Sequence, residues 1–414
     1  MFFYLVGIKG AAMSALAKLL MADGHLVKGV DVADHFYTCC GLESVQLDDF
    51  SNMRLKPSYF YIIGNAYHHH SVTKFLRNMH YKMLFYPDFL NYYYRLKKWV
   101  CISGSHGKTT TTKLLAHIIC DSTALIGDGE SQHSFSKTFI LEACEYRNTF
   151  LNYHPAISLV LNVDYDHPDF FKTEEAYRDS FSKFIQQSQL VVLNGDAVSL
   201  RFPNVITYGL NSKNDVVFQY EVKEGQSVIR IINHSFYFPY VGLHLAYDFV
   251  GAYLVGKFFG LTDTFIQQRI SSFAMPKRRM EQKEINGQVL ICDYAHHPTE
   301  IQALYSGIKA LYPKETIIAV FEPHTLSRLK TFEKKFQEAL LLFDRCYLYR
   351  LFTSCRETHH QKEENRVYQT LGFELYSEDI EQKLLAEQEG VVCFIGAGII
   401  DQVFEKYVKS KENL

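Results

Sequence analysis

The residues Gly104 to Thr110, Gly-Ser-His-Gly-Lys-Thr-Thr, have the types and the order of a site that binds a polyphosphate. Backbone N–H groups of a glycine-containing loop and the positive end of a helix dipole both attract phosphate oxygens. The Lys108 ammonium can reach the terminal phosphates, and the Thr109 hydroxyl can bind magnesium. The common motif has a further glycine at the position that Ile102 occupies here, so this loop is a shortened version.

Two elements are expected to position this loop. Trp99–Ile102 is a short apolar run typical of a buried strand, and Lys108 is expected to begin a helix. A strand before the loop and a helix after it favour a nucleoside triphosphate site over a chance Gly-Lys-Thr sequence. The candidate nucleotide-binding residues of the loop are Gly104, Ser105, His106, Gly107, Lys108, Thr109 and Thr110.

Acidic residues follow two apolar runs downstream of the loop. Residues 139–141 lead directly into Glu142, and residues 157–163 lead into the polar segment Asp164–Asp169. A carboxylate at the carboxyl end of a strand beside a phosphate loop can supply a magnesium ligand. The sequence favours Glu142 for this role, whereas a solvated loop is an equally good interpretation of the acids in the second segment.

A second glycine turn lies near the N-terminus. Residues 2–6 form an apolar run, and Gly7 and Gly10 lie in the turn that follows it. The next run ends at Asp31, about twenty residues later, which is typical of a site for a nucleotide phosphate and ribose. Asn65 follows another strand and so belongs to the same carboxyl edge of the sheet. The elements expected here are strands at 2–6, 26–30 and 59–63 and a helix at 14–21.

The last third of the chain alternates apolar runs with helical stretches, which predicts a parallel sheet with helices on both faces. Polar residues follow these runs, among them Tyr294, His296 and Arg328, and Lys277–Arg279 marks the junction with the middle segment. The end of the middle segment, residues 214–240, alternates like antiparallel strands. The strands expected in the last third are residues 289–293, 317–321, 346–352 and 391–395.

The length, composition and charge of the chain exclude several classes of protein. The 414 residues are 47% hydrophobic and 21% charged, which indicates a globular chain of two or three domains. The net charge of −2 gives no support for nucleic-acid or anionic-membrane binding. No apolar run is long enough to span a membrane. The nine cysteines include no Cys-x-x-Cys pair, and a reducing cytoplasm is expected. The histidines at 68–70 are interpreted as an exposed loop and not as a metal site.

Taken together, the motifs resemble those of the Mur ligases, and most closely the branch from Gram-positive bacteria that adds L-alanine to UDP-N-acetylmuramic acid. The matches are in the family's order and extend over nearly the whole chain. The matching segments are Gly7–Gly10, Gly104–Thr112, Glu142–Arg147, Asp166–Asp169, Lys277–Arg279, Asp293–Pro298 and Pro323–Thr325.

This resemblance implies an α/β, three-domain architecture. Residues 1–95 would form an N-terminal Rossmann-like domain that binds the UDP substrate. Residues 96–278 would form a central P-loop ATPase-like domain that binds ATP. Residues 279–414 would form a C-terminal Rossmann-like domain that binds the amino acid.

The resemblance also assigns roles to individual residues. Magnesium, or manganese in its place, would be bound by Thr109 and Glu142, with Glu142 and His167 around a second ion. The proposed catalytic residues are Lys108, Glu142, His167, His296 and Arg328. The ATP site would add His244, Asp248 and Arg278 to the phosphate loop. The substrate-binding residues would be Gly7, Gly10, Asp31 and Asn65 for the UDP part, and Tyr294, His296 and Arg328 for L-alanine.

The implied reaction is an ATP-dependent amide ligation. ATP converts the lactyl carboxylate to an acyl phosphate, and the amine of L-alanine then displaces phosphate. Because the attacking amine must be neutral, His296 is a candidate base. Arg328 would bind the carboxylate of the amino acid. The protein is expected in the cytoplasm as a monomer or homodimer.

Three positions depart from the family pattern. Asp248 stands where an asparagine usually contacts adenine, and an ionised aspartate cannot donate to N7. Thr325 stands where some members carry an arginine, and Ile399 where an aspartate is common.

These departures leave alternatives open. A ligase that recycles murein peptides, or one specific for another amino acid, would carry the same motifs. An inactive nucleotide-binding scaffold is disfavoured because Lys108, Thr109, Glu142 and His167 are all present. A motor-type ATPase is disfavoured by the short loop and by the additional nucleotide-type unit that precedes it.

Overall fold

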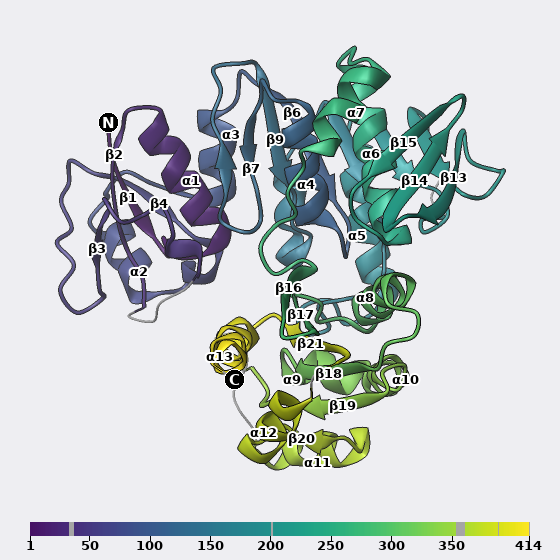
Figure 1. The fold of residues 1–414 in the computed structure, drawn as a ribbon. Coiled ribbons are helices and arrows are strands. Elements are labelled where there is room, and N and C mark those ends of the chain that lie inside the picture. The colour runs from purple at the N-terminus through teal and green to yellow at the C-terminus, as the bar shows by residue number, and fades with distance from the viewer. Residues whose placement is uncertain (33–36, 200–201, 353–360, 388, 414) are drawn as a thin grey trace. The chain divides into compact units, whose positions relative to one another are not determined.

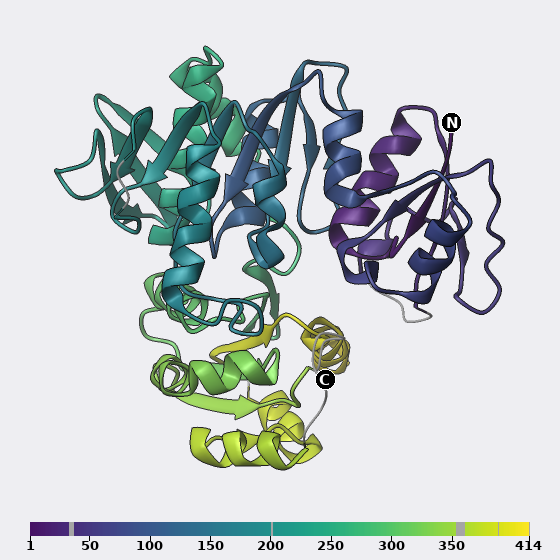
Figure 2. The ribbon, with the colours of Figure 1, turned by 180° about the vertical axis from the view of Figure 1, so that it is seen from behind.

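The computed structural model describes residues 1–32, 37–199, 202–352, 361–387 and 389–413 (Figures 1 and 2). The chain divides into two compact units. Unit 1 comprises Met1–Asp164, Arg178–Val217 and Asp248–Phe273, and unit 2 comprises Tyr165–Tyr177, Phe218–Tyr247 and Ala274–Leu414. No helix among the described residues is long and apolar enough to cross a membrane.

The first sheet of unit 1 is parallel and has the strand order β3-β2-β1-β4-β5. β1 lies at its centre, and Tyr4 and Val6 on β1 and Tyr61 and Ile63 on β4 are completely buried. The expected strands are confirmed, and the helix begins at Ala11, three residues before the expected Ser14. The elements are β1 (Phe2–Val6), α1 (Ala11–Ala22), β2 (Leu26–Val30), β3 (Gln46–Asp48), β4 (Phe60–Ile63), α2 (Ser71–Asn78), β5 (Met83–Phe85) and α3 (Tyr86–Tyr93).

The second sheet of unit 1 positions the phosphate loop. Its parallel strands run in the order β12-β11-β10-β6-β9-β7, and β8 pairs antiparallel with β7 at the edge. α4 packs against β6, β7 and β9. β10 ends at Val160, three residues earlier than expected. The elements are β6 (Lys98–Ser103), α4 (Lys108–Ile118), β7 (Thr123–Leu125), β8 (Ser131–Gln132), β9 (Thr138–Glu142), β10 (Ile157–Val160), α5 (Glu174–Gln186), β11 (Leu190–Asn194), β12 (Val205–Gly209), α6 (Leu243–Phe258) and α7 (Asp263–Ser271).

An antiparallel meander follows β12, as the alternation of residues 214–240 predicts. β13 (Val216–Lys223) pairs with β14 (Gln226–Ile231), and β14 pairs with β15 (His234–Phe238). Phe218 on β13 and Phe236 on β15 are buried while the residues on either side of them reach solvent, which is the pattern of a sheet covered on one face. In β14, Ser227, Val228 and Ile229 are all buried.

The third sheet, in unit 2, has the order β16-β17-β21-β18-β19-β20. β16 is antiparallel to β17, a hairpin that the sequence reading missed, and the other strands are parallel. β19 ends at Leu348, four residues earlier than expected. The strands are β16 (Glu281–Ile285), β17 (Gln288–Asp293), β18 (Ile317–Glu322), β19 (Arg345–Leu348), β20 (Glu374–Leu375) and β21 (Val391–Gly396).

Helices cover both faces of this third sheet, as predicted. Ile291 on β17 belongs to the apolar cluster beneath α8, α9 and α10, whereas its neighbour Leu290 belongs to the cluster beneath α12 and α13. Alternate residues of a strand point to opposite faces, so one strand contributes to both cores. The helices are α8 (Pro298–Leu311), α9 (Leu326–Thr331), α10 (Glu333–Leu340), α11 (Gln361–Leu371), α12 (Glu378–Ala386) and α13 (Ile400–Glu412).

Candidate active site

The phosphate loop has the predicted local geometry. β6 ends at Ser103 and α4 begins at Lys108, so the loop connects a buried strand directly to a helix N-terminus. Gly107 has φ +80°, a conformation that side chains disfavour. A Cβ atom at this position would also lie 2.6 Å from Oδ1 of Asp248. Glycine is therefore required at 107 both for the turn and for the close approach of Asp248.

Lys108 lies over the loop that precedes it. Its Nζ donates to the backbone oxygens of Gly104 and Ser105, and it lies 3.0 Å from a carboxylate oxygen of the completely buried Glu145. Burial lowers the pKa of Lys108, but the carboxylates of Glu145 and Glu142 outweigh this and raise the pKa above its ordinary value. The lysine is thus held as a cation at the loop that would bind phosphates.

Thr109 and Glu142, the predicted metal ligands of unit 1, are brought together. The Thr109 hydroxyl donates to Oε2 of Glu142 at 2.8 Å, and Glu142 is the last residue of β9. Burial raises the pKa of Glu142, and the charge of Lys108 acts in the opposite direction. A hydroxyl and a carboxylate oxygen are hard ligands, so this donor set fits magnesium.

Asn162 and Asp164, in the segment just after β10, bind the phosphate loop. Asn162 accepts from the His106 backbone N–H at 2.8 Å and donates to the His106 carbonyl at 3.1 Å. Asp164 Oδ2 lies 3.0 Å from His106 Nε2, and the Ser105 hydroxyl donates to the Asp164 carbonyl at 2.6 Å. The sequence analysis did not select Asn162, because this residue lies within residues 157–163, which were interpreted as a strand. A polar amide side chain within an apolar run was the signal that could have identified it.

Hydrogen bonds connect the N-terminal glycine turn to Asp31 and Tyr67. Asp31 accepts from the Lys9 backbone N–H at 2.7 Å and from the Tyr67 hydroxyl at 2.6 Å. Gly7 has φ +86°, and a Cβ atom there would lie 2.5 Å from the Tyr67 ring. Gly10 donates to the Gly7 carbonyl at 3.2 Å. The predicted Gly7, Gly10 and Asp31 are therefore connected through contacts that include Tyr67. The sequence did not indicate a role for Tyr67.

The other residues of unit 1 that were predicted to bind nucleotide or substrate do not form a single cluster. Asn65 donates to the Thr149 hydroxyl at 3.2 Å. Thr110 is buried in the first turn of α4. Asp248 is 5% exposed and lies on α6, one turn after His244. The contact of Asp248 with Gly107 brings it to the phosphate loop, whereas no described contact joins Asn65 to the Gly7–Gly10 turn.

In unit 2 a buried ion pair joins Asp166 to Arg328. Nε and Nη2 of Arg328 donate to the two Asp166 carboxylate oxygens at 2.8 and 3.1 Å, and both side chains are 4% exposed. Although burial raises the pKa of Asp166, the Arg328 charge outweighs it and holds that pKa well below its usual range. The solvated interpretation is therefore wrong for Asp166.

His167, the predicted metal ligand of unit 2, adjoins this ion pair. Its backbone N–H donates to Asp166 Oδ1 at 2.7 Å, and its φ of +55° is unusual for a residue other than glycine. The Asp166 carboxylate thus contacts both the backbone of a candidate metal ligand and the side chain of Arg328.

His296 and Tyr294 lie near Arg328 at the carboxyl edge of the third sheet. The ring centre of His296 lies 5.3 Å from that of Tyr294 and 5.6 Å from that of His324. Burial lowers the pKa of His296 to about 3, and Glu300, whose Oε2 lies 3.3 Å from Nδ1, partly opposes this. The imidazole is therefore neutral at pH 7 and able to accept a proton.

Arg278 is not part of a solvated linker. It is 5% exposed, its Nη2 donates to the Gly396 carbonyl at 2.8 Å, and its guanidinium lies 4.9 Å from the centre of the Tyr294 ring. The neighbouring strand β18 ends in Glu322, whose carboxylate accepts from the backbone N–H groups of Gly398 and Ile399. These contacts fix the turn before α13.

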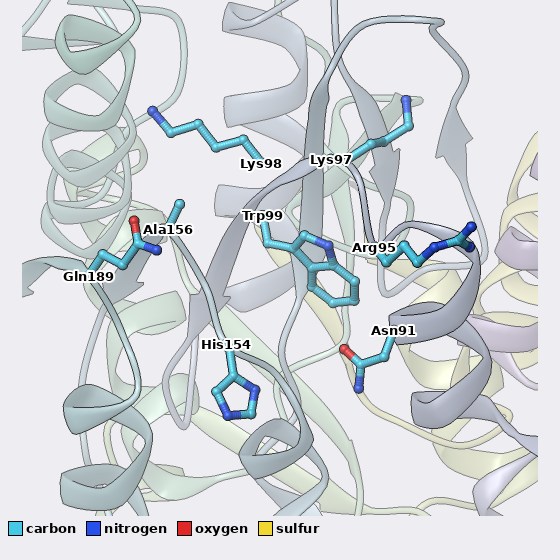
Figure 3. Close-up of a pocket in the computed structure, with 8 residues that line it drawn as sticks. All are labelled: Asn91, Arg95, Lys97, Lys98, Trp99, His154, Ala156 and Gln189. Carbon is cyan, nitrogen blue, oxygen red and sulfur yellow. The ribbon is translucent and has the colours of Figure 1, made fainter.

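A pocket of about 380 Å³ lies at the opposite, amino-terminal edge of the second sheet of unit 1 (Figure 3). Figure 3 shows that its basic side chains, Arg95, Lys97 and Lys98, point in different directions. They therefore do not converge on one bound group. None of the predicted site residues lines this pocket, which is formed by Asn91, Arg95, Lys97, Lys98, Trp99, His154, Ala156 and Gln189.

Comparison with known proteins connects this arrangement to a family. The profile described as Mur ligase middle domain matches residues 102–256, and the one described as Mur ligase, glutamate ligase domain matches residues 278–398. The chain is 34% identical over 426 residues to the UDP-N-acetylmuramate–L-alanine ligase of Limosilactobacillus reuteri, covering 98% of each chain.

Solved structures share the fold. The UDP-N-acetylmuramate-alanine ligase of Thermotoga maritima matches with a TM-score of 0.82 at 20% identity, covering 100% of this chain and 99% of its own. A murein peptide ligase of Psychrobacter arcticus matches with a TM-score of 0.71 at 20% identity and the same coverage. At this identity the two structures show a common α/β fold only.

Proposed function

This chain belongs to the Mur ligase family, and we propose that it joins L-alanine to the lactyl carboxylate of UDP-N-acetylmuramic acid, converting ATP to ADP and phosphate. The observation that carries the proposal is the 34% identity, over 98% of both chains, to a ligase named for this reaction. The expected setting is the synthesis of peptidoglycan precursors in the cytoplasm, by a monomer or homodimer.

In the first step, the loop Gly104–Thr110 and Lys108 would bind the ATP phosphates. A lactyl carboxylate oxygen attacks the γ-phosphorus, the bond to ADP breaks, and an acyl phosphate forms. The transition state spreads negative charge over the phosphate oxygens, so a lysine held as a cation lowers its energy.

Magnesium bound by Thr109 and Glu142, and a second ion at Glu142 and His167 as the family resemblance implies, would supply further charge compensation at the phosphates. Manganese prefers similar oxygen and nitrogen ligands and is expected to replace it.

In the second step, the amine of L-alanine attacks the acyl carbon, phosphate leaves, and the amine loses a proton. We assign acceptance of that proton to His296, which is neutral at pH 7 and close to Glu300. A base with so low a pKa is weak, so the proton transfer is favoured only when an anion, such as the departing phosphate, stabilises the imidazolium. Tyr294 and Arg328 would hold the amino acid.

The UDP part of the substrate is assigned to the N-terminal turn, with Gly7, Gly10 and Asp31 at the phosphates and ribose and Asn65 nearby. Adenine recognition is assigned to His244 and Asp248. Arg278, packed on Tyr294, is kept as a nucleotide-site candidate. The domain boundaries 1–95, 96–278 and 279–414 complete the proposal.

The test is product formation by the purified chain. With ATP, magnesium, UDP-N-acetylmuramic acid and L-alanine, we expect UDP-N-acetylmuramoyl-L-alanine by mass spectrometry. Parallel reactions with glycine, L-serine and a murein tripeptide measure the alternative specificities. A folded protein that forms no product at millimolar L-alanine would overturn the proposal, and faster reaction with the tripeptide would replace it with peptide recycling.

A further inference from the structure

The contact between Asp166 and Arg328 has a geometry that leaves part of the arginine available. A guanidinium has five N–H bonds arranged around a plane. Asp166 accepts from Nε and Nη2, which form one edge of that plane. Nη1 lies 3.1 Å from His324 Nδ1 and donates to the His324 carbonyl at 3.5 Å. On the edge formed by Nη1 and Nη2, Nη2 keeps one N–H bond, and a carboxylate that replaces His324 at Nη1 would receive two parallel hydrogen bonds.

Because the ion pair is buried, Asp166 restricts the conformation of the Arg328 side chain. Both side chains are 4% exposed, so the guanidinium has exchanged water for the Asp166 carboxylate. A long arginine side chain loses much rotamer freedom when it is held in one place. Asp166 has already imposed that order, and therefore a ligand that binds the remaining edge has less entropy to lose.

The charge of Asp166 acts in the opposite direction. With Asp166 ionised, the pair has no net charge, so an incoming carboxylate is not attracted by an unpaired cation. Its recognition depends on the fixed direction of the Nη1 and Nη2 hydrogen bonds. Removal of Asp166 would leave a more strongly attracting arginine in a less defined position, and the two effects have opposite signs.

We propose that Asp166 is a positioning residue, which holds Arg328 so that its Nη1–Nη2 edge binds the α-carboxylate of the amino acid. This inference rests on the proposed function and deepens it. Asp166 itself touches neither the amino acid nor ATP in this assignment. In this proposal the fixed position of Arg328 outweighs the loss of its net charge, so removal of the Asp166 carboxylate should weaken selection of amino acids that carry an α-carboxylate.

The test compares L-alanine with L-alaninamide, which has the same amine and methyl group but no carboxylate. In Asp166→Asn, which keeps the size of the side chain, we expect kcat/KM for L-alanine to fall by about 10- to 100-fold. The value for L-alaninamide should change by no more than about threefold, and so should the KM for ATP. The ratio of the two kcat/KM values is the readout, because a purely structural role would lower both together.

Glu387→Gln is the matched control. Glu387 accepts from both terminal nitrogens of Arg345, at 2.7 and 2.6 Å, in another paired contact of unit 2. This variant also loses one carboxylate from an arginine pair, but none of the predicted site residues is involved. We expect its alanine-to-alaninamide ratio to equal that of the wild type.

Asp166→Glu keeps the charge and moves the carboxylate by one methylene, so an intermediate ratio is expected. If Asp166→Asn does not fold, the same ratio is measured for Asp166→Glu instead. A wild-type ratio in every folded Asp166 variant, or an equal loss for both amines, would overturn the inference.

Failure of the proposed function would be observed in the wild-type protein, and is therefore distinguished from failure of the role assigned to Asp166. A wild-type protein that forms amides with another amino acid overturns L-alanine specificity, and the ratio is then measured with that amino acid and its amide. If no amide forms at all, binding of L-alanine and L-alaninamide to wild type and Asp166→Asn is compared by ligand-observed NMR. Equal preferences in the two proteins would then overturn the role of Asp166.

Discussion

The phosphate loop of unit 1 and the histidine–arginine cluster of unit 2 would bind charged groups by different means. The loop would use backbone N–H groups at a helix start and one lysine, all within the continuous segment Gly104–Thr110. The cluster would use side chains from three separate segments, at Asp166, His296 and Arg328. A local motif can be recognised from its spacing, whereas a cluster assembled from distant segments depends on how the chain packs.

The two regions also treat buried charge differently. Lys108 is shared among two carbonyls and a buried carboxylate, so its charge is spread over several partners. Arg328 is tied to one carboxylate through two parallel hydrogen bonds. The lysine can therefore exchange partners when phosphate binds, while the arginine is expected to stay in place.

The largest expected effect is at the loop. Lys108→Met removes the cation that would face the phosphates, and we expect kcat/KM for ATP to fall by about 1,000-fold. Steady-state phosphate release measures this. Lys183→Met, at an exposed lysine paired with Asp179 on α5, is the control and should retain the wild-type rate. A Lys108 variant within tenfold of wild type would contradict the role assigned to the loop.

A smaller and more selective effect is expected in the cluster. Arg328→Ala should raise the KM for L-alanine by about 100-fold and the KM for ATP by less than about threefold. It should also lower the free energy of unfolding by about 3–5 kcal/mol, because Asp166 is left buried without its partner. Kinetics with each substrate varied, together with urea unfolding, measure both effects. Equal increases in the two KM values would exclude Arg328 as the carboxylate anchor.

His296 predicts a pH dependence of stability. Its folded pKa of about 3 is below the ordinary value of about 6.5, so between these values the unfolded chain binds the additional proton. The stabilisation is complete above pH 6.5 and is lost, by about 1.4 kcal/mol per pH unit, as the pH falls toward 3.

His296→Gln should therefore reduce the dependence of the unfolding free energy on pH between 4 and 6.5, as measured by urea unfolding at several pH values. His69→Gln, at an exposed histidine, is the control and should keep the wild-type slope. An unchanged slope in His296→Gln would mean that the imidazole is protonated as readily in the folded chain as in the unfolded one.

The smallest effect is expected at Asp248. Its carboxylate lies against Gly107, close to where phosphates would bind, and it cannot donate to adenine N7. Asp248→Asn removes the negative charge and adds a donor, so the KM for ATP should fall by a few-fold. Comparison with 7-deaza-ATP separates the two causes, because this nucleotide has no N7 acceptor, whereas the loss of negative charge affects both nucleotides equally. A higher KM for ATP would contradict this account.

Much of the fold could be predicted from local patterns. The apolar runs at residues 2–6, 26–30 and 289–293 coincide with β1, β2 and β17 to within one residue. The errors are at strand ends and at strands that the patterns did not indicate. One of these is β16, whose polar sequence Glu-Gln-Lys-Glu-Ile shows little apolar alternation. Only its pairing with β17 makes it a strand, and that pairing is a tertiary contact.

The sequence by itself determined the phosphate loop, because a glycine turn and a helix start require only neighbouring residues. It also indicated that Glu142 ends a strand beside that loop. The sequence was equally compatible with Asp166 as a solvated loop residue. Only the tertiary structure decided that it is buried against Arg328, 162 positions away. Burial of a charge is tolerated only when a distant partner compensates it, and no local pattern identifies that partner.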